Sequence, residues 1–260
     1  QSLGVMTDMP GLMVRFEREQ RLPWRTRIAT GIIKWCLNNF KKYVFLTEAM
    51  NVVNERKRPY IVMEGMSDRF MATYKRPFEA KDIKVVMYAG GLHERYGLKK
   101  LTEAFMMLPQ ENFRLKLFGS GPFVEKLKTK YTKKDSRIQY MGVAPNAEVV
   151  AAELDASLLV NPRPTHEEFT KYSFPSKNIE YMASGTPLLT TKLPGMPKEY
   201  YPYVFLIENE SVEGYAKALE SVLAQSDEEL YVFGEKAKDF VLEKKNSFEQ
   251  AKRVIELIKL

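Results

Sequence analysis

The sequence predicts an α/β protein, with a doubly wound parallel sheet in its larger part and part of a second such sheet before it. Two observations support this prediction. From residue 84 onward, short apolar runs alternate with amphipathic helical stretches, which is the pattern of a parallel sheet covered by helices on both faces. Before residue 84 there are three further apolar runs, too few for a complete sheet of this kind.

Six buried strands and their helices account for residues 84–260. The first strand, KVVMYAG (84–90), is rich in valine, and the next helix places Leu98, Leu101 and Phe105 at helical spacing. The remaining strands are expected at 113–119, 137–142, 156–162, 186–191 and 203–207. Helices are expected at 97–108, 122–131, 145–155, 176–184, 211–224, 227–244 and 247–260. Six strands are too few for an eight-stranded barrel, so an open sheet is predicted.

The amino-terminal region is organised differently. Apolar runs at 3–8, 43–49 and 59–65 predict strands, with a short helix between the last two. Residues 10–42 predict one or two basic amphipathic helices interrupted at Pro23, and residues 66–83 are polar and turn-rich like a linker. We therefore expect two Rossmann-like units. Residues 1–75 are the incomplete tail of the first, and residues 76–260 form the complete second with its carboxyl-terminal helices.

The composition excludes several classes of protein. With 260 residues, 45% of them apolar and 28% charged, the chain is neither disordered nor a small disulfide scaffold. Its single cysteine, Cys36, can form neither an internal disulfide nor a cysteine-rich zinc site, which favours a reducing compartment. No apolar run approaches the roughly 18 residues that span a bilayer. The net charge of +7 favours an anionic partner: nucleotide phosphates, nucleic acid or an acidic membrane.

Glycines follow the first three strands of the larger sheet, at the edge where open α/β sheets bind ligands. They are Gly90 and Gly91 in AGGLHERYG, Gly119 and Gly121 in FGSGP, and Gly142, followed by Val143, in MGVAPN. Glycine lets a phosphate or base approach the backbone, and a helix N-terminus offers free N–H groups to an anion. One such turn is ordinary turn chemistry. Three in series, followed by YSFPSKNIEYMASGTP (172–187), predict a nucleotide site.

The order of these motifs resembles the carboxyl-terminal domain of a GT-B glycosyltransferase, and specifically family GT4, the glycosyl transferases group 1. The resemblance rests on strand–GGLxxxxG–helix, strand–GSGP–helix and SFPSKxxEYMASGTPLL, and it covers about residues 84–260 and, more loosely, 1–70. It implies a retaining, hexosyltransferase-type enzyme that moves a sugar from a UDP- or GDP-linked donor to a saccharide or lipid-linked acceptor. The implied pathway is synthesis of a surface polysaccharide or glycoconjugate, with the acceptor on the side of the amino-terminal unit.

The resemblance also implies roles for single residues. Glu180 matches the second glutamate of the family's E-x7-E motif, which is expected to hold the donor ribose hydroxyls, whereas Tyr172 stands where the first glutamate would be. The stretch whose backbone amides meet the donor sugar and diphosphate corresponds here to Ser173, Phe174, Pro175 and Ser176, with Lys177 as an additional cation.

Two other family positions differ in this sequence. Gly91 and Tyr96 stand where the family's glycine loop often has Arg and Lys, so Arg95, Arg163 and Lys177 become the candidate cations for the leaving diphosphate. Many members carry a His-Asp pair after an amino-terminal strand. Thr7 and Asp8 occupy those positions here, and only Asp8 matches. The candidate catalytic residues are therefore Glu180, Lys177, Arg163 and Asp8.

Neither a metal nor a cofactor is expected, because the nucleotide sugar is a substrate and GT-B enzymes resembling this one act without metal. The sequence has no Asp-x-Asp pair, and its two histidines are His93 and His166. His93 lies in the first glycine loop, where an exposed loop histidine is the simpler interpretation. His166 lies in PTHEEF, a loop that could contact the donor sugar.

Residues 10–42 combine many basic side chains with Trp24 and Trp35. This composition suits contact with an anionic membrane near a lipid-linked acceptor, and hence a cytoplasmic protein at the inner membrane face. The alternative is that these helices simply cover the sheet of the first unit. Uncovered strand edges of an incomplete sheet would favour a homo-oligomer or another partner chain.

Three other functions remain open at this point. A nucleotide-sugar-binding fragment without turnover is the main alternative, and we expect this chain alone not to transfer sugar at an enzyme-like rate. An NAD-dependent dehydrogenase is disfavoured because GSGPFV lacks the third glycine of G-x-G-x-x-G. A nucleic-acid-binding module is disfavoured because the basic residues belong to no known binding motif.

Overall fold

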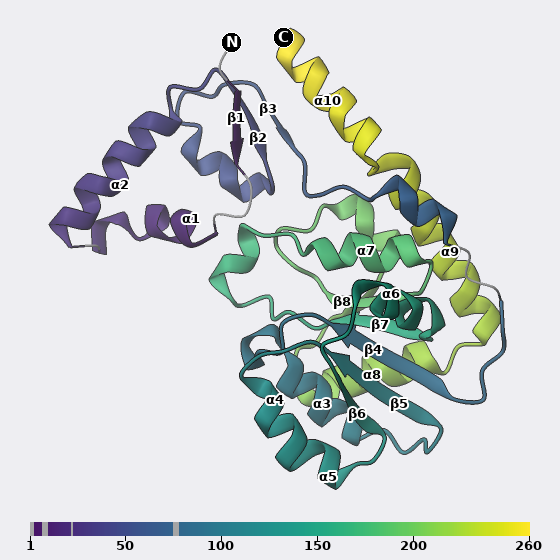
Figure 1. Ribbon diagram of the computed structural model, residues 1–260. Helices are drawn as coiled ribbons and strands as arrows, with labels where there is room; N and C mark the ends of the chain where they lie inside the picture. Colours follow the sequence, from purple (N-terminus) through teal and green to yellow (C-terminus); the bar gives the residue numbers. More distant parts are fainter. Residues whose placement is uncertain (1–2, 7–9, 22, 75–77) are drawn as a thin grey trace.

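The computed structural model describes residues 3–6, 10–21, 23–74 and 78–260, and it contains two parallel β-sheets in separate halves of the molecule (Figure 1). The larger sheet has the order β6-β5-β4-β7-β8-β9. Its strands are β4 (Lys84–Ala89), β5 (Phe113–Phe118), β6 (Ile138–Gly142), β7 (Leu158–Asn161), β8 (Leu188–Thr191) and β9 (Phe205–Ile207). All six lie where the sequence predicted strands, and the order reverses between β4 and β7. That reversal is the switch point at which doubly wound sheets bind ligands. The predicted fold class is confirmed.

Helices cover both faces of the larger sheet. On one face pack α3 (Leu98–Met106), α4 (Phe123–Lys126) and α8 (Val212–Leu223), and on the other α6 (Asn146–Asp155), α7 (Ser176–Ser184) and α9 (Asp227–Lys244). Side chains of β4 alternate between the two cores: Val86 and Tyr88 face the first, whereas Val85 and Met87 face the second. This double burial explains why the strands read as continuous apolar runs.

The helix predicted at 122–131 is not regular. It begins with α4, continues as a π-helical turn (Leu127–Tyr131) and ends in α5 (Thr132–Lys134). Pro122 stands at the N-cap, as expected of a residue without a free N–H. The π-turn buries both Leu127 and Tyr131 against the sheet, which places two bulky side chains four positions apart in the same core.

The smaller sheet has three parallel strands in the order β1-β2-β3: β1 (Leu3–Met6), β2 (Lys42–Phe45) and β3 (Tyr60–Val62). Residues between β1 and β2 form two helices, α1 (Pro10–Glu17) and α2 (Trp24–Leu37), and α2 begins directly after Pro23 as predicted. The short helix between β2 and β3 is a 3-10 helix (Glu48–Val53). Tyr43, Phe45 and Met50 form the centre of this unit's own core.

The segment predicted as a linker is anchored at its start. The Ser67 hydroxyl is buried and donates a hydrogen bond to the Val241 carbonyl at 2.8 Å, and a 3-10 helix (Arg69–Thr73) follows. The predicted division of the chain between residues 75 and 76 falls within the undescribed residues 75–77 and stays a prediction.

The last helix returns to the smaller sheet. α10 (Ser247–Lys259) leaves the larger unit and packs on β2 and β3 (Figure 1). Gln250 Nε2 donates to the Gly65 carbonyl and Arg253 Nη2 to the Val62 carbonyl, both at 2.8 Å. The chain therefore crosses between the two units twice, once through residues 66–83 and once into α10. Among the described residues, no helix has both the length and the apolar character needed to span a bilayer.

Candidate functional site

The three glycine-bearing turns lie side by side at the carboxyl ends of β4, β5 and β6. Gly119 N–H donates to the Gly142 carbonyl at 2.7 Å, and Leu92 N–H donates to the Ser120 carbonyl at 2.7 Å. Gly119 has φ +123°, and a Cβ there would lie 1.9 Å from the Gly90 carbonyl oxygen. Only glycine fits such a contact, so these turns form one continuous backbone surface.

The other predicted residues of these turns differ in their surroundings. A Cβ at Gly121 would lie 2.4 Å from the Leu92 carbonyl oxygen, whereas one at Gly142 would meet nothing within 4 Å. Gly91 is exposed, Gly90 is half-buried, and the Val143 side chain is 75% exposed. An apolar side chain held in solvent at the end of β6 is available to contact a flat ligand.

Two arginines surround an aromatic pair next to the first turn. Tyr96 and Phe169 lie with ring centroids 6.4 Å apart. The Arg95 guanidinium lies 5.1 Å and the Arg163 guanidinium 4.9 Å from the Tyr96 ring centre, and both lie 6.0 Å from that of Phe169. Such cation–π contacts hold the guanidinium groups in place without neutralising them. Neither guanidinium forms an ion pair with a carboxylate of the described residues.

The sequence predicted Arg95 and Arg163 separately, and the structure brings them together. Gly97 makes this possible: it has φ +83°, and a Cβ there would lie 1.8 Å from the Pro162 carbonyl oxygen. The turn after β4 can therefore approach the end of β7, the strand that Arg163 follows. Sequence reasoning named Tyr96 only as a departure from the family's loop and missed Phe169, because the pairing of the two rings depends on this approach of two distant loops.

The stretch from Ser173 to Ser176 has its side chains mostly inside. The Ser173 hydroxyl donates to the Phe169 carbonyl at 3.2 Å, and the Phe174 ring lies 5.1 Å from that of Tyr200. Pro175 is also buried, and Ser176, the first residue of α7, is exposed. These buried side chains hold the segment in place. A role for its backbone amides stays a prediction.

Tyr172, at the position of the first motif glutamate, belongs to the core of the smaller unit. It is 1% exposed and packs with Tyr43, Phe45 and Met50. The Thr47 hydroxyl donates to the neighbouring Lys171 carbonyl at 2.8 Å. Residues 171–172 thus connect the two units, and a buried tyrosine replaces the carboxylate that the family motif has here.

Lys177 and Glu180 form an ion pair on the first turns of α7, with Nζ 2.8 Å from the Glu180 Oε1. Nζ also lies 3.6 Å from Oε1 of Glu153 on α6. Glu153 is fully buried, and burial together with the nearby Glu180 charge raises the pKa of its carboxyl to about 7. The sequence predicted Lys177 and Glu180 and gave no sign of Glu153.

The remaining candidates are a loop aspartate and two histidines. Thr7 and Asp8 lie outside the described residues. The His93 ring is half-buried and meets Tyr96 edge-on, with ring centroids 5.2 Å apart. His166 is exposed, and its Nδ1 lies 3.8 Å from Glu210 Oε2. In the described ranges, no three His, Cys, Asp or Glu side chains gather in a group that could hold a metal ion.

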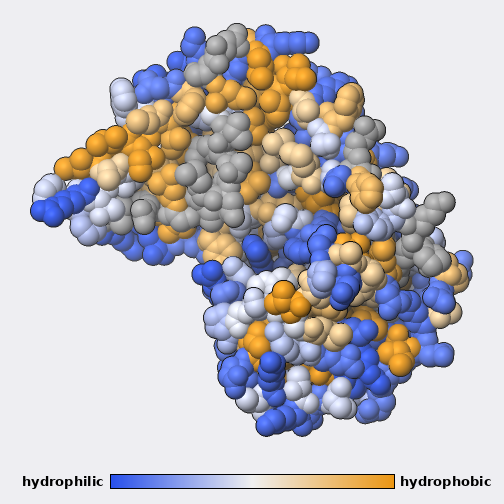
Figure 2. All heavy atoms as spheres, viewed as in Figure 1, coloured by the Kyte–Doolittle hydropathy of each residue, from blue (hydrophilic) through white to orange (hydrophobic). Residues whose placement is uncertain are grey.

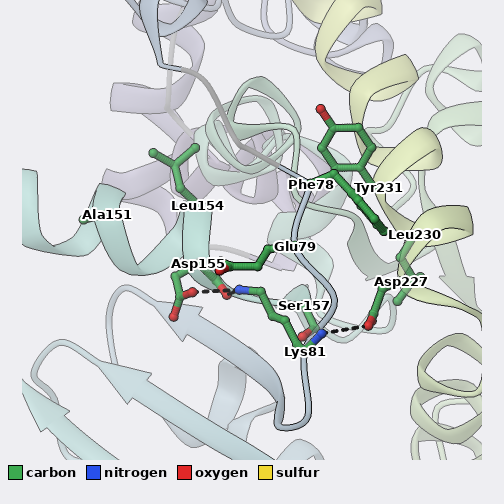
Figure 3. A pocket seen from close by; sticks show the side chains of 10 residues that line it. All are labelled: Phe78, Glu79, Lys81, Ala151, Leu154, Asp155, Ser157, Asp227, Leu230 and Tyr231. Carbon is green, nitrogen blue, oxygen red and sulfur yellow. Dashed lines mark hydrogen bonds and ion pairs between the residues drawn. The ribbon is translucent and has the colours of Figure 1, made fainter.

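Two of the pockets in the described part of the chain have similar volumes and lie away from the glycine turns. One, of about 220 Å³, lies at the amino ends of the strands (Figure 3). There Lys81 Nζ lies 2.7 Å from Asp155 Oδ1, and the Lys81 backbone N–H donates to Asp227 Oδ2. This pocket lies at the sheet edge opposite the glycine turns. The other, of about 210 Å³, lies between the two units and is lined by Glu48, Val62, Glu64, Pro194, Gly195, Met196, Pro197, Glu199 and Arg253.

Comparison with known families agrees with this arrangement. A sequence model described as "Glycosyl transferases group 1" matches residues 72–258. This chain belongs to the glycosyl transferases group 1. The family resemblance predicted from the strand-end motifs is therefore confirmed, and the match spans every strand of the larger sheet.

Among individual proteins, the group 1 chain is 30% identical over 112 residues to the "Putative colanic acid biosynthesis glycosyltransferase WcaL" of Escherichia coli (strain K12). That match covers 41% of this chain and 27% of the relative. The chain thus matches only about a quarter of the length of this curated relative.

Solved structures show the fold. Sucrose-phosphate synthase from Thermosynechococcus elongatus is 18% identical to this chain, with a TM-score of 0.73. The match covers 99% of this chain and 67% of the synthase chain. Anabaena HepE, in complex with UDP and glucose, is 13% identical to this chain, with a TM-score of 0.68. The match covers 99% of this chain and 71% of the HepE chain. TarM of S. aureus, solved in a complex that includes UDP, is 15% identical with a TM-score of 0.68 and covers 88% of this chain and 46% of its own.

Proposed function

We propose that this group 1 chain binds a nucleotide-sugar donor at the carboxyl edge of its larger sheet and serves in glycosyl transfer to a saccharide or lipid-linked acceptor. The observation that carries the proposal is the contact between the glycine turns. They offer partly exposed backbone at the switch point, and it is flanked by two guanidinium groups that form no ion pair within the described residues.

The chemistry of glycosyl transfer suits these groups. The bond between the anomeric carbon and a phosphate oxygen breaks, and negative charge collects on the departing diphosphate. Arg95 and Arg163 are cations beside the turns, and the N-terminus of the nine-residue α7 offers free N–H groups. Both would stabilise that charge as it develops. Glu180 would accept hydrogen bonds from the ribose hydroxyls.

The donor we favour carries UDP. HepE and TarM were solved with UDP. A structure titled "Trehalose-6-phosphate from E. coli", which is 11% identical to this chain with a TM-score of 0.69, was solved with UDP-2-fluoro glucose bound. We further propose a hexosyl donor, retention at the donor carbon and a place in polysaccharide or glycoconjugate synthesis. The first two follow from the family resemblance, and the third agrees with the colanic acid relative.

Thermal unfolding with UDP, GDP, ADP and CMP tests the proposal. A ligand at 100 times its Kd stabilises the folded state by about 2.7 kcal/mol, which gives a clear shift in Tm. We expect UDP to give the largest shift, and amide NMR signals of residues 90–96, 119–122, 142–146 and 172–177 to move together. Shifts confined to the pocket of Figure 3 would contradict the proposal.

A specific observation also favours binding without turnover. Tyr172 is buried where the family motif has its first glutamate, so one carboxylate of the expected site is missing. A transfer assay with UDP-sugars and a lipid-extract acceptor pool separates the two functions, with donor hydrolysis as control. Donor binding without acceptor glycosylation would favour the binding function, and robust glycosylation by a monomer would exclude it.

We also propose that α2 contacts an anionic membrane, which would bring the chain to a lipid-linked acceptor at the cytoplasmic face. Trp24, Ile28, Ile32 and Trp35 are exposed and lie at helical spacing along this helix, where they form one stripe. Figure 2 shows hydrophobic side chains gathered over this part of the molecule. Residues 20–47 contain no acidic side chain and include Arg21, Arg25, Arg27, Lys34, Lys41 and Lys42. Exposed aromatic and aliphatic side chains with Arg21, Arg25 and Arg27 nearby in the sequence match an acidic lipid surface.

A further inference from the structure

Glu153 is a buried carboxylate without a hydrogen-bond partner. It lies near the carboxyl end of α6 with 0% of its surface exposed, and neither of its oxygens accepts a hydrogen bond within the described part of the chain. Buried carboxylates are normally paired, because burying an unpaired charge is costly. For Glu153 the only cation nearby within the described residues is Lys177, whose Nζ lies 3.6 Å from Oε1, so this burial calls for an explanation.

One lysine lies between this carboxylate and the donor site. Lys177 Nζ is 2.8 Å from Glu180 Oε1 but 3.6 Å from Glu153 Oε1, beyond hydrogen-bond distance. The Lys177 and Glu180 side chains are 32% and 29% exposed, so the pair borders solvent while Glu153 lies behind it. Within the described chain, Lys177, Glu180 and Tyr181 of α7 are the charged or titratable groups that interact with Glu153.

We propose that Glu153 is a positioning residue for the nucleotide site, because it competes with Glu180 for the Lys177 ammonium. The proposal rests on the proposed function, in which Glu180 binds the ribose. When Glu153 is ionised, it draws Nζ inward and leaves the Glu180 oxygens free to accept hydrogen bonds from ribose hydroxyls. When Glu153 is protonated, Lys177 stays on Glu180, as it does in this structure.

The exchange takes place near neutral pH. Burial, followed by the Glu180 charge, raises the pKa of Glu153 to about 7, and the Lys177 charge opposes this only in part. Glu153 is therefore mostly protonated at pH 6 and mostly ionised at pH 8. The site consequently favours nucleotide binding at the higher pH.

UDP binding by calorimetry at pH 6 and pH 8 tests this inference. In wild type we expect the Kd for UDP to fall by about two- to fivefold from pH 6 to pH 8. This is the change in Kd that corresponds to releasing one partly exposed ion pair. Glu153→Gln keeps the shape but cannot ionise, so this part of the pH dependence should vanish. Because UDP itself changes charge near pH 6, the informative quantity is the difference between variants. Glu220→Gln, exposed on α8, is the matched control.

Carboxyl-carbon NMR of the nucleotide-free protein gives an independent measurement. As Glu153 ionises and attracts Lys177, the carboxyl-carbon signal of Glu180 should move near pH 7, and this movement should be absent in Glu153→Gln. A Glu180 signal that does not move near pH 7, or equal UDP pH profiles in both variants, overturns the inference. If UDP fails to bind wild type at any pH, the proposed function fails for UDP, and the movement of the Glu180 signal alone decides whether the two glutamates share the lysine.

Discussion

A single buried carboxyl makes the stability of this protein depend on pH. The pKa of Glu153 is raised from its ordinary value to about 7, so between about pH 4.5 and 7 the folded state holds a proton that the unfolded state has lost. Glu153 therefore lowers stability as pH rises through this window, and its effect is complete above pH 7. A shift of this size corresponds to about 3 kcal/mol.

Glu153→Gln removes this loss. We expect the free energy of unfolding of the variant, relative to wild type, to increase by up to about 3 kcal/mol between pH 5 and pH 8. Urea unfolding at both pH values measures it. An equal difference at the two values would show that Glu153 ionises at an ordinary pKa in the folded protein.

Glu180→Gln should weaken nucleotide binding by about 1–3 kcal/mol, because an amide replaces a charged acceptor of hydrogen bonds from the ribose. Calorimetric titration with the nucleotide that gives the largest thermal shift measures the change. Glu213→Gln, exposed at the start of α8, controls for the loss of one negative charge. Unchanged affinity in a folded Glu180→Gln protein would leave Glu180 as a surface partner of Lys177.

Single residues could be predicted from the sequence where their residue type usually serves one structural or chemical purpose at that place in the fold. Glycines after consecutive strands predicted a ligand site at one edge of the larger sheet, and Arg163 was predicted from its place after a strand. Glu153 could not be predicted, because a glutamate in EVVAAELD reads as part of the solvent face of an amphipathic helix. Its burial follows from how closely α6 packs against α7, which no local pattern encodes.

At the scale of elements, the turn after β5 should tolerate no side chain. Gly119→Ala would place a methyl group 1.9 Å from the Gly90 carbonyl oxygen at φ +123°, so we expect a loss of at least about 2 kcal/mol in stability together with weaker UDP binding. Gly31→Ala in α2 is the control: nothing lies within 4 Å of the added carbon, and alanine favours a helix by up to about 1 kcal/mol. Thermal unfolding compares the two, and equal Tm changes would refute the assigned contact.

The stripe on α2 allows a direct optical test. Trp24 and Trp35 are the two tryptophans of the sequence, and each is 66% exposed. With vesicles rich in phosphatidylserine we expect a blue shift of their fluorescence, which should be absent with phosphatidylcholine and reduced by salt. The Ile28→Ser/Ile32→Ser variant should lose the shift, whereas Phe248→Ser, at an exposed apolar residue of α10, should keep it. A blue shift that needs no vesicles and accompanies a doubled mass would identify a second copy as the partner.

Helices and strands could be predicted from the sequence where they bury one face or both faces, because each case leaves its own pattern of apolar residues. Every predicted strand is present, since a strand buried on both faces needs an apolar run. The π-turn at Leu127–Tyr131 was not predicted, because one inserted residue in a helix changes no propensity. The apolar positions of 247–260 predicted an amphipathic helix, and they could not tell which of the two sheets it covers.

At the scale of the molecule, α10 joins the two units through backbone acceptors of the smaller one. Gln250→Ala/Arg253→Ala removes the bonds to the Gly65 and Val62 carbonyls, and we expect a loss of about 1–3 kcal/mol in stability. Limited proteolysis should then cut between residues 42 and 62 sooner than in wild type. Lys252→Ala, exposed on the same helix, should leave both unchanged. Loss of stability without earlier cleavage there would place the effect within the larger unit alone.

The return of α10 also has a consequence for synthesis of the chain. The Lys42 ammonium donates to the Ile258 carbonyl, 216 positions later in the sequence. At about 5–20 residues per second, β2 leaves the ribosome roughly 10–40 s before its partner residue is made. During that interval the larger sheet can fold, while the face of β2 and β3 that α10 will cover stays open to chaperones. The smaller sheet therefore reaches its final packing last, although its strands are made first.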